Sequence, residues 1–224
     1  MNMILMKAAP ILFAGTKTKS RSSTKEALMN RRLFASLFAA VLFTGFTGTA
    51  AHAQSSTWTI DKNHAEITFS IRHMGVSTVR GSISGITGDV VWDGKDPATA
   101  SVNATIDANT LTTNNETRDK HLKSPDFFDV QKFPTLTFKS TSIQRVHGKL
   151  QVTGDLTLTG ITKPVTLDIE GPTAPQKGMQ GGQVIGLSAT GVLHRSDFNF
   201  GSKFGAPMLG DDVQFTIDLE ADQK

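Results

Sequence analysis

Apolar and polar side chains alternate with a period of two through most of residues 66–220, and this pattern limits the chain to few folds. Ile67, Phe69 and Ile71, for example, alternate with Thr68 and Ser70. The pattern returns in further stretches, at residues 102–107, 136–138, 156–158, 165–169, 185–189 and 213–220. Since successive side chains of a strand point to opposite faces of a sheet, each stretch is predicted to be a strand with one buried face.

Turn-forming residues separate these stretches. Pairs that contain glycine, at residues 93–94, 147–148, 171–172 and 181–182, predict tight turns. Many antiparallel strands with one polar face each must either pack as two sheets or close into a barrel. Both arrangements bury alternate residues, so the periodicity alone does not choose between them.

One region, residues 114–129, lacks the alternation and is polar and charged. Its apolar members are Leu122, Phe127 and Phe128. Thr113 or Asn114 is predicted to cap a short helix that runs to Leu122. Ser124 followed by Pro125 is typical of a second helix start. The predicted fold class is therefore all-β with one short helical excursion.

The first 53 residues have the parts of a secretory signal peptide. Two arginines at 31–32 precede an apolar run over residues 33–46, and small residues follow at Ala51 and Ala53. A run of this length is shorter than the roughly 20 residues that cross a bilayer as a helix. We expect a leader over residues 1–53, with a functional start at Met29 and cleavage after Ala53. A single domain over residues 54–224 would then be exported.

The formal net charge of +3 is divided unevenly between the leader and the domain. Seven of the 23 basic residues but only one of the 20 acidic residues lie in residues 1–53, so the remaining 16 basic and 19 acidic residues give the domain a net charge of −3. A nucleic-acid-binding domain concentrates Lys and Arg on its folded body, because phosphate neutralisation supplies much of the affinity. Nucleic acid is therefore not expected as a partner.

The sequence carries no recognisable catalytic or metal-binding motif. The absence of cysteine excludes disulfides, thiol catalysis and Cys-ligated metals. There is no nucleophile elbow, phosphate-binding glycine loop or zinc-protease motif. The histidines of the domain, at positions 64, 73, 121, 147 and 194, do not pair at helix spacing or on one face of a strand. We therefore expect neither an enzyme nor a resident metal.

Seven segments of the domain form an ordered set. They are WTID (58–61), HAEITFSIRH (64–73), GVSTVRG (75–81), HLKSPDFFD (121–129), FPTLTFKST (133–141), GDLTLTGITKPV (154–165) and RSDFN (195–199). In this order and spacing they closely resemble the YceI family of bacterial periplasmic polyisoprenoid-binding proteins. The resemblance covers residues 58–220. The chain departs from the family pattern at Asn199, where glycine is more usual.

The resemblance implies an antiparallel, lipocalin-like barrel of about eight strands, whose apolar lumen can hold one small ligand. It implies binding of a long isoprenoid chain, of the polyprenyl phosphate or quinone type, for transport, storage or a stress response, and it does not imply catalysis. No cofactor is expected other than the bound isoprenoid lipid or quinone as ligand. The family context also allows a membrane quinone or cytochrome partner and a homodimer.

An isoprenoid has almost no hydrogen-bonding groups outside its head, so its affinity must come from buried apolar area, at about 25 cal/mol per Å². The predicted inward face would line the lumen with Ile67, Phe69, Ile71, Leu136, Phe138, Leu156, Leu158, Leu187, Phe215 and Ile217. Two alternatives stay open. The ligand is a fatty acid or amide, or the same residues pack one another and the domain is a structural or interaction module without a ligand.

Four polar side chains are candidates for contact with the ligand's head group at the mouth of the barrel. His73 ends an apolar strand face, His121 lies on the helical excursion, and Arg72 and Arg80 flank the turn at residues 74–79. Leu122, Phe127 and Phe128 are predicted to form a lid over one end.

Overall fold

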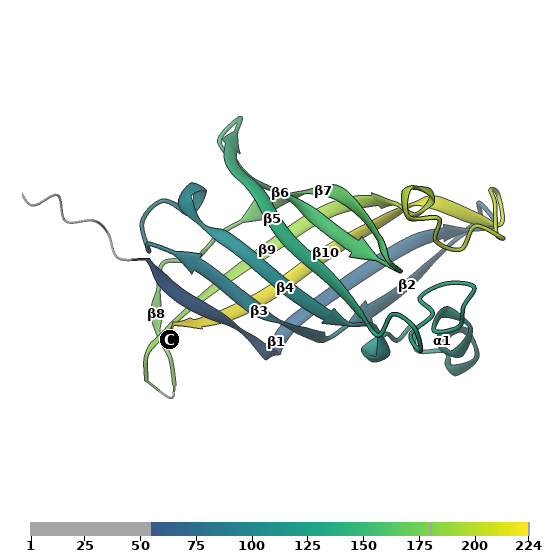
Figure 1. The fold of residues 1–224 in the computed structure, drawn as a ribbon, viewed down its shortest axis with the longest axis horizontal. Coiled ribbons are helices and arrows are strands. Elements are labelled where there is room, and N and C mark those ends of the chain that lie inside the picture. Colours follow the sequence, from purple (N-terminus) through teal and green to yellow (C-terminus); the bar gives the residue numbers. More distant parts are fainter. Residues whose placement is uncertain (1–54, 180, 224) are drawn as a thin grey trace, which may run out of the picture. The chain divides into compact units, whose positions relative to one another are not determined.

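The computed structural model describes residues 55–179 and 181–223, which form a closed antiparallel β-barrel (Figure 1). The predicted leader, with its start at Met29 and its cleavage after Ala53, lies outside the described residues.

Strands make up most of the described chain. They are β1 (Ser56–His73), β2 (Ser77–Ile83), β3 (Gly85–Trp92), β4 (Ser101–Asp107), β5 (Thr135–Val146), β6 (Lys149–Leu158), β7 (Ile161–Glu170), β8 (Gln176–Lys177), β9 (Gln183–His194) and β10 (Leu209–Gln223). The helix α1 (Glu116–Leu122) and the 3-10 turns η1 (Pro97–Thr99), η2 (Ala108–Thr110) and η3 (Arg195–Phe198) lie between them. No helix among the described residues is both long and apolar enough to span a membrane.

The sheet closes into a ring because β10 pairs with both β1 and β9. From β1 the ring continues through β3, β4, β5, β6 and β7 to β9. β2 and β3 share one place in this ring, since β3 pairs with residues 56–59 of β1 and β2 pairs with residues 67–73. The ring therefore has eight strand positions, all antiparallel, which confirms the predicted barrel; β8 only extends the edge of β9.

β1 runs from one end of the barrel to the other and contains a bulge. The register with β10 shifts between Ile60 and Ala65, where the Asp61 carboxylate accepts a hydrogen bond of 2.9 Å from the Asn63 N–H. A bulge adds residues to one strand and so reverses which face a given position takes. Before the bulge the buried residues have even numbers, such as Trp58, and after it they have odd numbers, such as Ala65. This change of phase explains why the alternation detected from residue 66 onward missed the first part of the strand.

The helical excursion differs in detail from the prediction. The helix α1 begins at Glu116, and its cap is Asn115, whose Oδ1 accepts a 3.0 Å hydrogen bond from the Arg118 N–H. Asn114 has a φ of 57°, which is incompatible with the extended backbone of a cap residue. The second predicted helix start, at Ser124, is a turn, in which the Ser124 carbonyl accepts from the N–H groups of Phe127 and Asp129.

Asn199, the departure from the family pattern, ends the η3 turn with a φ of 52°. Glycine is favoured in this left-handed region, and asparagine is among the few other residues that enter it routinely. The substitution therefore keeps the local backbone that glycine would adopt.

Candidate functional site

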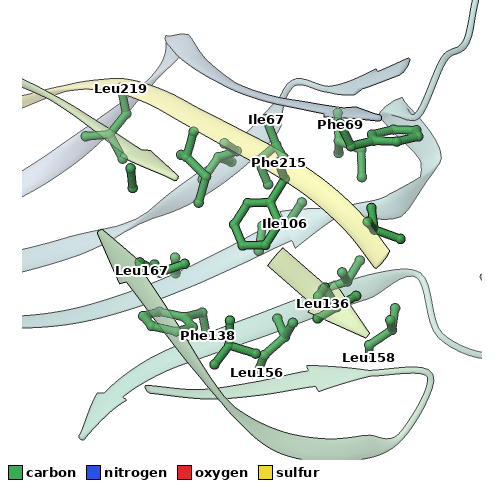
Figure 2. Close-up of a pocket in the computed structure, with 18 of the residues that line it drawn as sticks. Ile67, Phe69, Ile106, Leu136, Phe138, Leu156, Leu158, Leu167, Phe215 and Leu219 are labelled. Atoms are coloured by element: carbon green, nitrogen blue, oxygen red, sulfur yellow. The ribbon is translucent and has the colours of Figure 1, made fainter. Parts of the chain in front are cut away.

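The barrel encloses a cavity of about 480 Å³, within the range of about 300–1,000 Å³ that is usual for small-molecule sites. Inward-facing side chains from every strand position of the ring form its wall. Figure 2 shows part of this wall, including Ile67, Leu136 and Phe215. All ten predicted lumen residues lie on this wall: Ile67, Phe69, Ile71, Leu136, Phe138, Leu156, Leu158, Leu187, Phe215 and Ile217.

These inward-facing side chains are not packed as a filled core. Nine of the ten predicted lumen residues are only half-buried, and the exception is Leu158, which is 3% exposed. In a filled interior the same side chains would cover one another and lose their exposed surface. Their remaining exposure faces the cavity, so the lumen of this barrel is open.

Three phenylalanine rings on the wall lie against glycines of the neighbouring strands. The pairs are Phe69 with Gly81, Phe138 with Gly154 and Phe215 with Gly191. A Cβ atom at Gly81 would lie 2.5 Å from Phe69 Cζ, and one at Gly191 would lie 2.6 Å from Phe215 Cζ. Normal carbon–carbon contacts are about 3.5–4.0 Å. The rings therefore use the space above the glycines, and a side chain there would push them inward.

We predict that Gly191→Ala destabilises the fold by about 1–3 kcal/mol, because the added methyl overlaps the Phe215 ring. Gly205→Ala is the matched control, since a Cβ at Gly205 meets no atom within 4 Å. Urea unfolding of the two variants measures the difference. Equal stability of both variants would show that the ring moves aside without cost.

Two chain segments meet over the end of the barrel where β1 finishes. They are the lid segment, residues 114–133, and the rim loop, residues 199–208. Phe127 of the lid segment stacks on Phe204 of the rim loop, with ring centroids 5.2 Å apart and an interplanar angle of 4°. Phe128 meets Phe200 edge-on at 4.7 Å. The predicted lid residues Leu122, Phe127 and Phe128 all line the cavity.

Polar contacts join the same two segments. Lys203 Nζ of the rim loop lies 2.5 Å from the Asp126 carboxylate of the lid segment, and His121 Nε2 lies 3.2 Å from the same carboxylate. The Lys203 hydrogen bond, followed by that of His121, holds the pKa of Asp126 below its usual value. Sequence reasoning missed the rim loop, although the phenylalanines at positions 200 and 204 in a turn-rich segment were a signal for it.

Arg195 fixes the course of the rim loop. Its side chain is 6% exposed and donates hydrogen bonds to five backbone carbonyl oxygens. The acceptors are Gly210 at 2.7 Å, Phe200 at 2.9 Å, Gly201 at 3.0 Å, Phe204 at 2.5 Å and Leu209 at 3.1 Å. Arginine is the side chain that offers five N–H donors in one planar group. Arg195 therefore acts on the cover of the cavity through the backbone.

We predict that Arg195→Lys destabilises the protein by about 3 kcal/mol or more, because three ammonium donors cannot satisfy five buried carbonyls. Amide hydrogen exchange in residues 199–208 should accelerate together with the loss of stability. The control is Arg72→Lys, at an exposed side chain with two hydrogen bonds, which should change stability by no more than about 0.5 kcal/mol. An unchanged rim loop in the Arg195 variant would contradict this account.

The four predicted mouth residues divide into two groups. His73 and His121 line the cavity. Arg72 and Arg80 do not, contrary to the expectation. Arg72 instead donates to Gly75 O at 2.8 Å and to Thr78 Oγ1 at 2.9 Å across the turn between β1 and β2.

The reason lies in the alternation itself. Arg72 is next to the inward-facing His73, and Arg80 is next to the inward-facing Val79, so both arginines point to the outer face. Arg118 of α1 also lines the cavity, and it donates to Thr113 Oγ1 at 2.7 Å and to Thr113 O at 3.0 Å.

Asp119 ties α1 to the barrel. Its carboxylate accepts hydrogen bonds from the Thr113 N–H at 2.8 Å, from Thr112 Oγ1 at 3.1 Å and from the Thr113 hydroxyl. Burial acts to raise the pKa of Asp119, but the hydrogen bonds from Thr113 and Thr112 and the charge of Lys123 outweigh it, so the pKa is lowered. The ionised carboxylate thus stabilises the folded lid segment.

A lowered folded-state pKa gives stability that is present above the unfolded-state pKa and is lost as the pH falls through the folded-state value. We predict that Asp119→Asn is less stable than the unaltered protein at pH 7. The difference should shrink as the pH falls below the usual carboxyl range, because both proteins then carry a neutral group at this position. Urea unfolding at several pH values checks this, and a pH-independent difference would exclude the electrostatic contribution.

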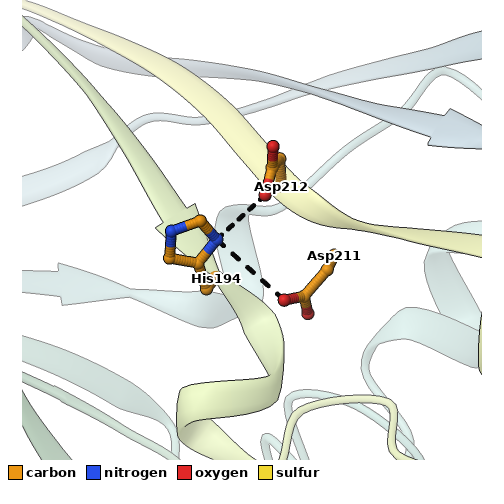
Figure 3. A group of neighbouring side chains, drawn as sticks. All are labelled: His194, Asp211 and Asp212. Carbon is orange, nitrogen blue, oxygen red and sulfur yellow. Dashed lines mark hydrogen bonds and ion pairs between the residues drawn. The ribbon is translucent and has the colours of Figure 1, made fainter.

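A cluster of His194, Asp211 and Asp212 lies on the outer surface near the base of the rim loop (Figure 3). His194 Nδ1 is 2.9 Å from Asp212 Oδ1 and 3.9 Å from Asp211 Oδ2. Asp211 also accepts from the Ser196 N–H at 2.9 Å and from its hydroxyl at 2.8 Å. All three side chains of the cluster are exposed, and their contacts are those of a surface ion-pair group that anchors η3 to β10.

The protein is thus a closed eight-stranded barrel with an apolar lumen, and the lid segment and the rim loop together cover one end of this lumen. A family model described as a YceI-like domain matches residues 58–221. The chain therefore belongs to the YceI family.

Known relatives agree with this assignment. The chain is 38% identical over 198 residues to Protein YceI of Salmonella agona, which covers 88% of this chain and all of that protein. It is similar to the crystal structure of a Campylobacter jejuni YceI protein, with 33% identity, a TM-score of 0.61, and 69% of this chain and 90% of that chain covered. A polyisoprenoid binding domain from Saccharophagus degradans shares the fold at 12% identity and a TM-score of 0.57, with 76% of this chain and all of that chain covered.

Proposed function

We propose that this protein is a binding protein that holds one long apolar lipid, of the isoprenoid type, inside its barrel. The exported domain would carry or store the lipid in the periplasm, and a polyprenyl phosphate or a quinone tail fits the class. The bound lipid is a ligand and the protein has no catalytic role in this proposal. A membrane quinone or cytochrome is the partner that this chemistry suggests, and a homodimer is compatible with it.

The observation that carries the proposal is the open apolar lumen. Among the described side chains on its wall, His73, Arg118, His121 and Arg195 are the ionisable ones, and the others are aliphatic, aromatic, methionine or proline. The Arg195 side chain has five N–H donors and already makes five hydrogen bonds to backbone carbonyls, so it has little capacity left for a ligand. Such a wall gains free energy mainly by covering apolar surface of an occupant, at about 25 cal/mol per Å².

Two further observations support the ligand class. The chain belongs to the YceI family, and a protein of the same fold is described as a polyisoprenoid binding domain. The leader predicted from residues 1–53 supports export, since its basic start, apolar run and small residues are those of a secretory signal.

The test is binding of solanesol, a nonaprenyl alcohol, by the domain and by two tryptophan variants. We predict that solanesol raises the unfolding temperature of the unaltered protein, because a ligand that binds only the folded state stabilises it. Leu136→Trp places a larger side chain in the lumen and should weaken binding at least tenfold. Thr137→Trp is the matched control, since this exposed neighbour on β5 points outward, and it should bind normally.

Equal binding by the two variants would place the ligand outside the lumen and contradict the proposal. Fatty acids and amides are tested in the same assay, and tighter binding of these than of solanesol would assign the protein to the alternative class of fatty acid or amide carriers.

A further inference from the structure

Two buried tryptophans lie at the end of the barrel opposite the lid. Trp58 on β1 and Trp92 on β3 have ring centroids 6.0 Å apart and are 1% and 5% exposed. They pack with Val90, Ile185 and Ala221. Trp58 precedes His73, at the lid end, by most of the length of β1. Since a strand rises about 3.3 Å per residue, the two tryptophans and the lid lie at opposite ends of the barrel.

Both indole nitrogens of this pair lack a partner. Trp58 Nε1 and Trp92 Nε1 are buried, and neither has a hydrogen-bond acceptor within the described part of the chain. An indole N–H is a donor only, and in folded proteins it usually finds an acceptor when it is buried. A buried donor without one is rare in native structures, and a water molecule or a ligand can supply the missing acceptor.

The two tryptophans differ in their relation to the cavity. Trp92 is part of the cavity wall, whereas Trp58 is not among the residues that line it. Trp92 Nε1 is itself covered by neighbouring atoms, so only a compact acceptor that displaces them can reach it.

The surroundings select a neutral acceptor. The polar side chains of the wall, His73, Arg118, His121 and Arg195, belong to the lid end, where His73 pairs with Leu209 and Arg195 bonds to the rim loop. The wall next to Trp92 is apolar, with Val90, Ala100 and Ile185 among its members. A phosphate or carboxylate buried there would lose its hydration without a charged partner, which is far more costly than burial of a carbonyl.

We propose that Trp92 is a polar subsite at the closed end of the lumen, where its Nε1 donates a hydrogen bond to a neutral carbonyl oxygen of the ligand. The carbonyl belongs to a ketone, a quinone or an amide. The ligand enters with this end first and extends its apolar chain toward the lid. The inference rests on the proposed function and adds to it the chemical class and the orientation of the ligand.

The chain is well suited to a direct test, because Trp58 and Trp92 are its only tryptophans. A ¹H–¹⁵N NMR spectrum of the protein therefore contains two indole signals, which single Trp→Phe variants assign. The probes are 2-heptadecanone and heptadecane, which have equally long carbon chains and differ in one carbonyl. We expect the ketone to bind about two- to tenfold more tightly, the gain of one neutral hydrogen bond. The Trp92 indole proton should move downfield with the ketone and not with the alkane.

The variants provide the matched comparison. Trp92→Phe keeps an aromatic ring but removes the donor, so it should bind both probes equally. Trp58→Phe removes the partnerless donor that does not line the cavity, so it should keep the preference for the ketone. If either variant fails to fold, the indole shift in the unaltered protein decides.

The outcomes separate this inference from the proposed function. Binding of both probes with equal affinity and unchanged indole signals overturns the subsite and leaves lipid binding intact. A water molecule that contacts the Trp92 indole proton in the free protein and stays in the ketone complex also overturns it, because water is then the acceptor. Failure of both probes to bind overturns the subsite together with the proposed function.

Discussion

The sheet closes into a ring of eight strand positions because β10 pairs with both β1 and β9. The space inside this ring depends on the glycines that lie beneath the phenylalanines of its wall. An eight-stranded barrel is just wide enough for its own side chains to fill it or for one small ligand. In this barrel Phe69 and Phe215 lie above Gly81 and Gly191 of the adjacent strands, so the rings occupy space that larger residues at these positions would take. The open lumen depends on these missing side chains as much as on the apolar residues that line it.

The two ends of this lumen are chemically different. At the lid end, aromatic stacking between Phe127 and Phe204 and the ion pair between Asp126 and Lys203 join two separate segments. At the other end, Trp58 and Trp92 close the barrel within a continuous apolar cluster. Because the closed end is part of the folded core and the lid end consists of loops, movement of a ligand would take place through the lid end.

That cover depends on the buried positive charge of Arg195, whose side-chain hydrogen bonds go to backbone carbonyls. The guanidinium of Arg195 is buried among backbone carbonyls of the rim loop and of the start of β10. Each carbonyl offers partial negative charge, and together they accept the five N–H donors of the group, while the Asp211 carboxylate adds an electrostatic attraction. The loop that carries Phe200 and Phe204 is thereby held in one conformation while its own backbone has no regular secondary structure.

The strands and the face that each of them buries were predictable from the sequence because alternation is a local property. Phe69, Phe138 and Phe215 follow from it directly, and they line the cavity in the structure. The same rule, applied one residue further, would have placed Arg72 and Arg80 on the outer face, where the structure has them. The choice between a filled and an open lumen was not predictable, since it depends on which glycines face which rings across strands.

Other parts of the site depend on contacts between residues distant in sequence. The rim loop meets the lid segment through Lys203 and Asp126, and no local pattern links these positions. The bulge at residues 61–64 changed the phase of β1, so the alternation detected from residue 66 did not extend to Trp58. No local pattern showed that Trp58 would meet Trp92 of β3. Family resemblance supplied the barrel and the ligand class but not this arrangement of its two ends.

The most direct test of the account is native mass spectrometry of the protein purified from its own cells without added lipid, followed by organic extraction. The account predicts one apolar lipid per chain, released on unfolding and identified in the extract. A mass equal to that of the bare mature polypeptide, together with an unfolding temperature that added isoprenoids do not raise, would contradict it.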